Sequence, residues 1–132
     1  MIEFKPVRLE DRAVIERYTM PSGICNCDLA FANMYCWQEV FHSAWAEIDG
    51  FLVIRFQIDG GERIGYMQPV GTGDLGAIIP SLREDAHAHG QRLRIIGLTD
   101  EGRETIARVH PCRFAFESDR ALEDYVYNAD DL

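Results

Sequence analysis

The sequence lacks any long run of hydrophobic residues. No stretch approaches the roughly eighteen consecutive apolar residues of a membrane-spanning helix, and residues 1–6 lack the apolar segment of a secretory signal peptide. We therefore expect a cytoplasmic protein without a membrane span. Hydrophobic residues still make up 47% of the 132 residues, which is enough for one domain with a core of its own.

Positive charge is also scarce. Thirteen Lys and Arg residues stand against 22 Asp and Glu residues, which gives a net charge of -9. An electrostatic field of this sign repels nucleic acid and anionic membrane surfaces. We therefore expect no direct binding of nucleic acid by this domain.

Residue spacings typical of disulfide frameworks or metal sites are missing as well. The four cysteines form no C-x-x-C pair, and in a reducing compartment we expect them to be thiols. His87 and His89 lie two positions apart on a predicted helix, where they face different directions and cannot easily share one ion. We therefore expect no metal site.

A glycine-rich stretch, residues 68–76, lies between a predicted strand and a predicted helix. Residues 68–73 match the acyl-coenzyme A pattern Q-x-x-G-x-G, and residues 71–76 match the dinucleotide pattern G-x-G-x-x-G. Both patterns hold a phosphate with backbone N–H groups at the positive end of a helix. The dinucleotide pattern normally follows a central strand of a parallel sheet, whereas this stretch follows a predicted antiparallel meander, so we disfavour it.

The coenzyme A interpretation fits the position of the turn but not all of its residues. Its phosphate cradle would be the backbone of four residues, Val70, Gly71, Thr72 and Gly73. Pro69 has no N–H group to offer, and Asp74 places a carboxylate beside the phosphates and can cap the helix itself. Pro80 predicts that the regular helix starts or kinks near Ile79. We expect a plain strand-to-helix turn without a cofactor, with a coenzyme A derivative as the alternative.

Hydrophobic periodicity predicts a short strand and two helices before residue 40. The strand lies within residues 1–7, and residues 9–18 form a helix with one apolar face. Asp28 can cap a second helix over residues 29–37. Because this helix is apolar on nearly every side, we expect it to be deeply buried.

An antiparallel meander of three strands is predicted next, near residues 43–48, 51–58 and 63–68. Its turns, Asp49-Gly50 and Asp59-Gly60-Gly61, accept the positive φ angles that tight hairpins require. In the middle strand the even-numbered residues from Leu52 are apolar, while Arg55 and Gln57 point the other way. This alternation predicts a sheet with one well-packed face.

The second half of the chain predicts a βαβ unit. After the glycine turn come a helix ending at Gly90, a strand over residues 93–98 and a helix that follows Thr99-Asp100 and stops at Pro111. Residues 113–117 and 125–127 are predicted closing strands. The resulting fold is α/β (α+β), a mixed sheet with an antiparallel meander and a βαβ unit flanked by helices, in one domain over residues 1–132.

This order, with Q-x-x-G-x-G after the fourth strand, resembles the GNAT acyltransferase fold. A closer resemblance rests on residues 28–37, 49–54, 68–74 and 124–132. These stretches resemble the first half of the phosphatidylglycerol lysyltransferase C-terminal-like family, whose members have two GNAT-like halves in tandem. The aminoacyl-transferring members of that family use aminoacyl-tRNA.

The resemblance implies that this chain is the first of two halves and that the second half is absent from it. It further implies a scaffold or substrate-binding half without a complete active site, whose partner is a second GNAT-like half or a second copy in a homodimer. The alternatives are a stand-alone acyl-CoA-dependent N-acyltransferase and a self-associating binding module.

Catalytic candidates also come from the resemblance. GNAT enzymes often use a tyrosine in or near the helix after the fifth strand as a general acid. The predicted helix over residues 100–110 contains none, so Tyr125 and Tyr127 are the nearest candidates. Alternating tyrosines at the end of a sheet more often serve packing.

Overall fold

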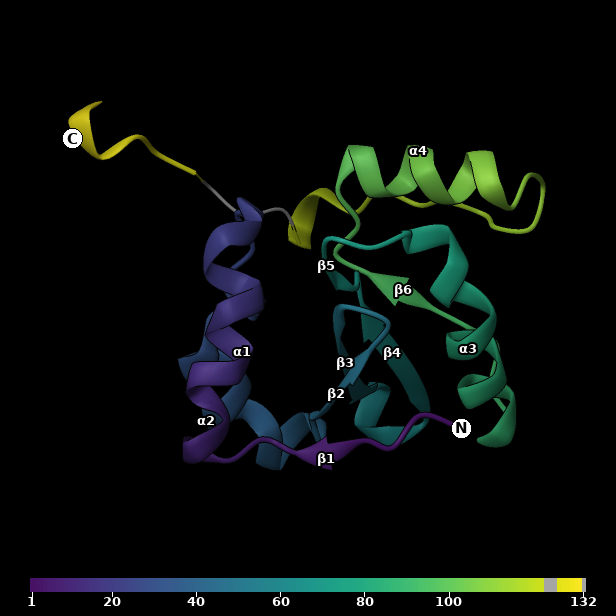
Figure 1. Cartoon of the computed structure of the whole chain (residues 1–132), viewed down its shortest axis with the longest axis horizontal. Helices are drawn as coiled ribbons and strands as arrows, with labels where there is room; N and C mark the ends of the chain where they lie inside the picture. Colours follow the sequence, from purple (N-terminus) through teal and green to yellow (C-terminus); the bar gives the residue numbers. More distant parts are fainter. Residues whose placement is uncertain (123–125, 132) are drawn as a thin grey trace.

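Helices cover both faces of a mixed sheet (Figure 1). The computed structural model describes residues 1–122 and 126–131. Helices α1 (Arg12–Thr19) and α2 (Phe31–Phe41) lie on one side of the sheet, and α3 (Leu75–Ala88) and α4 (Asp100–Val109) lie on the other. Short 3-10 helices occupy connections, at Leu9–Asp11, Met20–Ser22, Cys27–Leu29, Asp59–Gly61, Arg120–Leu122 and Ala129–Asp131.

The sheet combines an antiparallel meander with one parallel pair. Its order is β1 (Lys5–Pro6), β2 (Ala44–Ile48), β3 (Phe51–Ile58), β4 (Arg63–Met67) and β6 (Ile95–Ile96), and β5 (Val70–Gly71) also pairs with β3. Neighbours from β1 to β4 are antiparallel, and β4 and β6 are parallel, joined through α3. The predicted α+β fold, with its meander and βαβ unit, is therefore confirmed.

A bulge of one residue separates β4 from β5. Tyr66 of β4 faces Arg55, and Val70 of β5 faces Leu52, so four steps along β4 and β5 match three steps along β3. The extra residue lies in the Gln68-Pro69 segment, and a bulge is one of the places where a sheet tolerates proline. The bulge marks the start of the glycine turn.

The two predicted hairpin turns have the expected backbone. The φ angles are 48° and 82° at Asp49 and Gly50, and 52° and 67° at Asp59 and Gly60. Both turns therefore use the positive φ angles that match the twist of the flanking strands. The two turns therefore set the end of β2 and both ends of β3.

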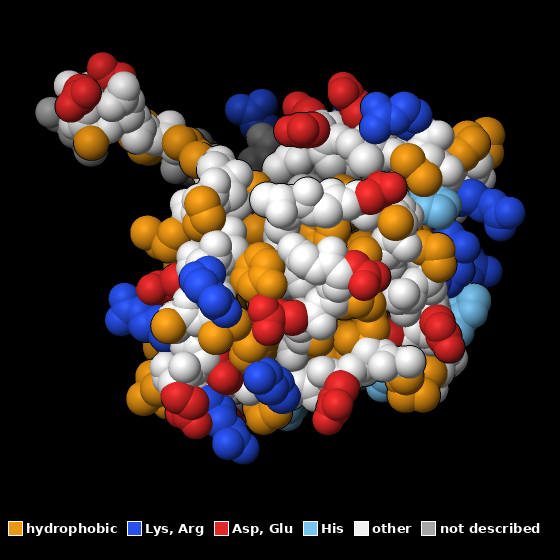
Figure 2. Space-filling model, viewed as in Figure 1, with side chains coloured by type: hydrophobic (Ala, Val, Ile, Leu, Met, Phe, Trp, Pro, Cys, Tyr) orange, Lys and Arg blue, Asp and Glu red, His pale blue; other side chains and the backbone are white. Residues whose placement is uncertain are grey.

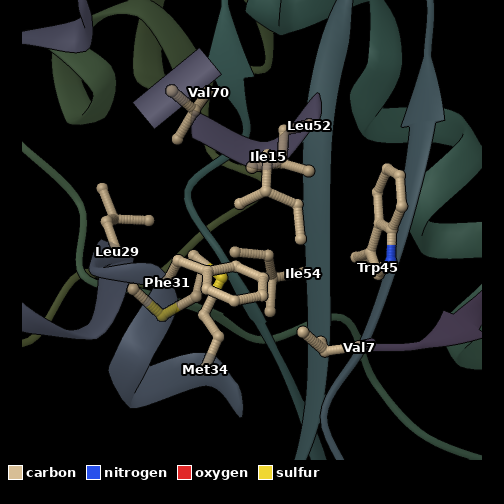
Figure 3. Packing of buried hydrophobic residues seen from close by; sticks show 10 residues of the cluster. Val7, Ile15, Leu29, Phe31, Met34, Trp45, Leu52, Ile54 and Val70 are labelled. Atoms are coloured by element: carbon tan, nitrogen blue, oxygen red, sulfur yellow. The ribbon is translucent and has the colours of Figure 1, made fainter. Parts of the chain in front are cut away.

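Both faces of the sheet are packed. One cluster lies against α1 and α2 (Figure 3): Val7, Ile15, Leu29, Phe31, Met34, Trp45, Leu52, Ile54, Met67 and Val70. The other lies against α3 and α4: Phe51, Val53, Tyr66, Ile78, Ile79, Leu82, Ala86 and Ile106. The prediction of one packed face was wrong. The charge of Arg55 suggested that its side of β3 is polar, but Phe51 and Val53 lie on the same side of the strand and are buried.

Helix α2 differs from its prediction in its start and in its burial. It begins at Phe31, after an extended Ala30 that makes no side-chain cap, because residues 27–29 form a separate 3-10 turn that the side chain of Asn26 caps. Trp37 and Val40 are 54% and 60% exposed, so the expected deep burial was wrong. A helix that is apolar all round buries only the face that meets the sheet.

Helix α3 begins at Leu75 and contains Pro80. Of the two predicted possibilities, a start or a kink near Ile79, the start was wrong. A proline inside a helix leaves the carbonyl four residues earlier without its N–H partner. That carbonyl belongs to Gly76, and it accepts a hydrogen bond from Nε2 of His110 at 2.9 Å. A side chain from the far end of α4 therefore satisfies the group that Pro80 leaves open.

The predicted closing strand over residues 113–117 does not form, although all five residues are described. Phe114 packs against the second cluster instead, and its ring meets the His110 ring nearly edge-on at 6.4 Å. The prediction was wrong because Phe114 reaches the α3 and α4 side without a neighbouring strand, whereas Phe116 is 38% exposed. Of the other predicted strand, residue 125 lies outside the described residues, and Val126 and Tyr127 form no strand.

Candidate functional site

The glycine turn is tied to α4 through its first residue, Gln68. The side-chain oxygen Oε1 of Gln68 accepts hydrogen bonds from the Thr99 N–H at 2.8 Å and from the Thr99 hydroxyl at 3.2 Å. Thr99 caps α4, since its hydroxyl oxygen accepts from the Gly102 N–H at 3.0 Å. A Cβ at Gly102 would overlap the Gln68 amide. Gln68 therefore positions the start of α4.

Gly71 and Gly73 lie against the turn between β2 and β3. A Cβ on Gly71 would overlap the Gly50 carbonyl oxygen and lie 2.9 Å from the Phe51 Cα atom. A Cβ on Gly73 would lie 2.8 Å from the Phe51 ring. Neither glycine has a positive φ angle, so lack of room, rather than backbone conformation, requires glycine at both positions.

Asp74 caps the N-terminus of α3, as predicted. Its Oδ1 accepts from the Gly76 N–H at 3.0 Å, and its backbone carbonyl accepts from the Ala77 N–H at 3.1 Å. First-turn N–H groups are the donors that a bound phosphate uses. The chain's own carboxylate therefore already holds a donor that an anion would need.

The four residues of the predicted phosphate cradle are Val70, Gly71, Thr72 and Gly73. Val70 is 3% exposed and belongs to the first cluster, whereas the other three are exposed. Residues 68–76 contain no Lys, Arg or His, so the turn brings no positive side chain to neutralise a pyrophosphate. It offers an anion only backbone groups and one hydroxyl.

The turn nevertheless lies where two parallel strands separate. The Gln68 N–H donates to the Ile96 carbonyl at 3.0 Å, and no pairing of β4 with β6 extends beyond this point in the described residues. An open end between parallel strands, followed by a helix N-terminus, is a common place for ligands in α/β folds. The position of the turn therefore favours ligand binding, whereas its residues disfavour the binding of an anion.

Of the two tyrosines predicted as catalytic candidates, the structure describes Tyr127. Tyr127 is 71% exposed in the C-terminal segment, residues 126–131, which projects from the domain in Figure 1. Tyr125 lies outside the described residues. A role for either tyrosine in catalysis stays a prediction.

A buried polar network links β3, β4 and α3. Asp85 of α3 is 2% exposed, and its Oδ2 accepts from the Tyr66 hydroxyl at 2.5 Å and from Nη1 of Arg55 at 3.0 Å. The guanidinium of Arg55 lies over the Phe4 ring, 4.2 Å from its centre. Because each charge has a partner, the network can stay buried.

Burial and the hydrogen bond to Asp85 raise the pKa of Tyr66 above its ordinary value of 10. Tyr66 therefore stays protonated at neutral pH as the donor to Asp85, and the network ties the sheet to α3. This network is not among the sites predicted from the sequence. The available signal was an acidic residue, Asp85, between Leu82 and Ala86 on the buried face of α3.

A groove of about 540 Å³ lies between the N-terminal residues, β2 and α3. Three carboxylates line it, from Glu3, Glu47 and Glu84, together with Lys5, whose Nζ lies 4.1 Å from the centre of the Trp45 ring. This excess of negative charge disfavours a ligand that carries phosphates. The groove is therefore not an alternative site for coenzyme A.

Neither a metal-binding cluster nor a membrane-spanning helix occurs in the described residues. No group of three or more His, Cys, Asp or Glu side chains that could hold a metal ion was found in residues 1–122 and 126–131. None of the helices in the same ranges has the length and apolar character to cross a membrane.

The chain is similar to a known protein family and to a solved structure. The family model described as "Phosphatidylglycerol lysyltransferase, C-terminal" matches residues 23–132. A crystal structure of a conserved protein of unknown function from Bacteroides thetaiotaomicron is 40% identical, with a TM-score of 0.87, over 92% of this chain. The match covers 40% of that longer protein. No curated protein matches.

The family match covers most of the chain and includes both the glycine turn and α2. It confirms the family expected from the sequence, whereas the assignment to a first half stays a prediction. This chain belongs to the family of phosphatidylglycerol lysyltransferase C-terminal domains.

Proposed function

We propose that this domain is the scaffold or substrate-binding part of an aminoacyl- or acyltransferase and has no complete coenzyme A site of its own. One observation carries the proposal: the residues that match Q-x-x-G-x-G are already engaged in packing. Gln68 holds the start of α4, and Gly71 and Gly73 make room for the β2–β3 turn.

The electrostatics of the turn support the same proposal. Asp74 accepts the Gly76 N–H, and a carboxylate beside a pyrophosphate would repel it. No basic side chain within residues 68–76 compensates for that repulsion. Binding of a dianionic or more highly charged cofactor here would therefore require displacing the cap.

The greater length of the Bacteroides relative supports a domain that functions together with a further polypeptide region. The match covers 40% of that chain, so a protein with this domain can carry a longer second region. In our proposal that region, or a separate chain like it, supplies the missing catalytic groups. The family description makes the transfer of a lysyl group to phosphatidylglycerol the first reaction to assay.

A second candidate function is a stand-alone acyl-CoA-dependent N-acyltransferase. The observation that favours it is the separation of β4 and β6 at Gln68, in the same turn that leads to the α3 N-terminus at Leu75. In this alternative the exposed backbone of residues 71–73 would hold the pyrophosphate. The two functions make opposite predictions for binding of coenzyme A.

Isothermal titration calorimetry with coenzyme A and acetyl-coenzyme A separates the two functions. Our proposal predicts no binding heat up to millimolar ligand. The matched variants are Thr72→Glu, which places a negative charge on the exposed turn, and Ala107→Glu, which places one on the exposed side of α4. Micromolar binding that Thr72→Glu abolishes and Ala107→Glu preserves would establish the acyltransferase alternative instead.

A further inference from the structure

Helix α2 presents a second apolar surface away from the sheet. We call it the α2 outer face; it consists of Ala32, Cys36, Trp37, Val40 and Phe41, which are all exposed. Trp37 is 54%, Val40 60% and Phe41 39% exposed, and the Trp37 and Phe41 rings lie 6.0 Å apart. Clustered exposed aromatic residues of this kind mark interaction surfaces.

The α2 outer face carries little charge. Glu39 is the one charged residue of α2, and it lies on the edge of the face, beside Cys36 by helical spacing. On the near side of the molecule, Figure 2 shows hydrophobic side chains that reach the surface between charged ones over α1, the helix that lies in front of α2 in this view. A partner surface that binds the α2 outer face must therefore be apolar at the centre of the contact.

Side-chain size changes along the α2 outer face. Ala32 and Cys36 in its first half are small, whereas Trp37, Val40 and Phe41 in its second half are large. Two such helices in antiparallel contact place the large half of each over the small half of the other. A twofold axis at Cys36 brings Ala32 opposite Val40, and the two copies of Cys36 opposite each other.

We propose that the α2 outer face binds the same face of a second copy of this chain, in an antiparallel arrangement with the twofold axis at Cys36. The size gradient makes the face complementary to itself, as an isologous interface requires. This proposal goes beyond the function proposed above and does not depend on whether coenzyme A binds.

The one charged residue of α2 is also accommodated by this arrangement. The twofold axis at Cys36 places Glu39 opposite Asn33 of the second copy. The side-chain amide of Asn33 donates to the Cys27 carbonyl at 2.8 Å, and an asparagine amide has two N–H groups. One N–H group therefore remains to donate to the carboxylate across the axis.

The area of the face predicts a weak dimer. The exposed parts of Trp37 and Phe41 together offer roughly 200 Å² per protomer, since an aromatic side chain buries about 150–250 Å². Stable complexes bury about 800 Å² per partner. With a net charge of -9 on each copy, we expect weak association at low salt that becomes tighter as salt screens the repulsion.

Sedimentation equilibrium and tryptophan fluorescence across the micromolar range test this association. Trp45 is 1% exposed, so Trp37 reports on the face, and its emission is expected to shift to shorter wavelength as the dimer forms. We expect Trp37→Glu and Val40→Glu to weaken association at least about tenfold. Met20→Glu is the control, since Met20 is 76% exposed outside the face.

Cysteine cross-linking tests the position of the axis. All four cysteines are exposed. Mild oxidation is expected to give a covalent dimer that Cys36→Ser removes and that Cys112→Ser and Cys25→Ser leave unchanged. Far-ultraviolet circular dichroism of each variant confirms that it remains folded.

Three results would overturn the proposal. The first is a monomer at the highest concentration in high salt, and the second is a dimer that Val40→Glu and Trp37→Glu leave intact. The third is a Trp37 emission shift that phosphatidylglycerol vesicles cause and protein concentration does not, which would assign the face to lipid.

Discussion

Replacing Gly71 with alanine separates a packing role of the glycine turn from a purely cofactor-binding one. If glycine were needed only for the approach of a phosphate, Gly71→Ala would leave the stability of the ligand-free domain unchanged. In the structure, the new Cβ meets the Gly50 carbonyl oxygen and the Phe51 Cα atom. Both are backbone atoms, which cannot rotate away as the end of a side chain can.

The expected loss of stability follows from that overlap. Forcing an extra carbon into a filled site costs about 1–3 kcal/mol, and backbone contacts place Gly71→Ala at the upper end, about 2–3 kcal/mol. Thr72→Ala is the matched control in the same turn, because Thr72 is exposed. A surface change of this kind alters the free energy of unfolding by about 0.5 kcal/mol or less.

Urea denaturation followed by tryptophan fluorescence measures both variants. With a slope of about 2 kcal/mol per molar urea, Gly71→Ala is expected to lower the midpoint by about 1–1.5 M, at an unchanged slope. A midpoint within the range of Thr72→Ala would refute the packing role of Gly71.

Three further predictions follow from the contacts around the turn and the buried network. Gln68→Ala leaves the Thr99 N–H without its acceptor and is expected to lower the free energy of unfolding by about 1–2 kcal/mol in thermal melts. Asp85→Ala leaves the buried Tyr66 hydroxyl and Arg55 without a partner, and its expected cost in urea denaturation is about 3 kcal/mol; a cost below that of Gln68→Ala would contradict the network. Because the pKa of Tyr66 is raised in the folded state, the unfolded chain loses this proton first, so the contribution is intact below pH 10 and falls above it by up to about 1.4 kcal/mol per pH unit. Tyr66→Phe is expected to remove that slope, and equal slopes in both proteins would argue against it.

The parts of the fold that depend on neighbours in sequence could be predicted. The β2–β3 hairpin follows from Asp49-Gly50, and the start of α4 follows from Thr99, because turn and cap residues act within three or four positions. The Asp74 cap belongs to the same class. Local chemistry therefore fixed where these elements begin and end.

Features that join distant segments could not be predicted. Asp85 is 30 residues from Arg55 and 19 from Tyr66 in sequence, and no spacing pattern links such positions. The burial of α2 also depends on what covers it, which an apolar sequence alone does not specify. Likewise, the need for glycine at Gly71 arises from a hairpin that lies twenty positions earlier in the chain.

The most direct test of the central claim is a residue-resolved titration of the glycine turn. Backbone amide resonances of residues 70–77 can be followed by NMR while coenzyme A is added to millimolar concentration. We predict that the resonances of Gly71, Thr72, Gly73 and Gly76 stay in place. Gly71 and Gly73 are engaged in packing, the Gly76 N–H is held by the cap, and the turn has no positive side chain that attracts an anion to Thr72. Saturable shifts of those four resonances at micromolar ligand would contradict it.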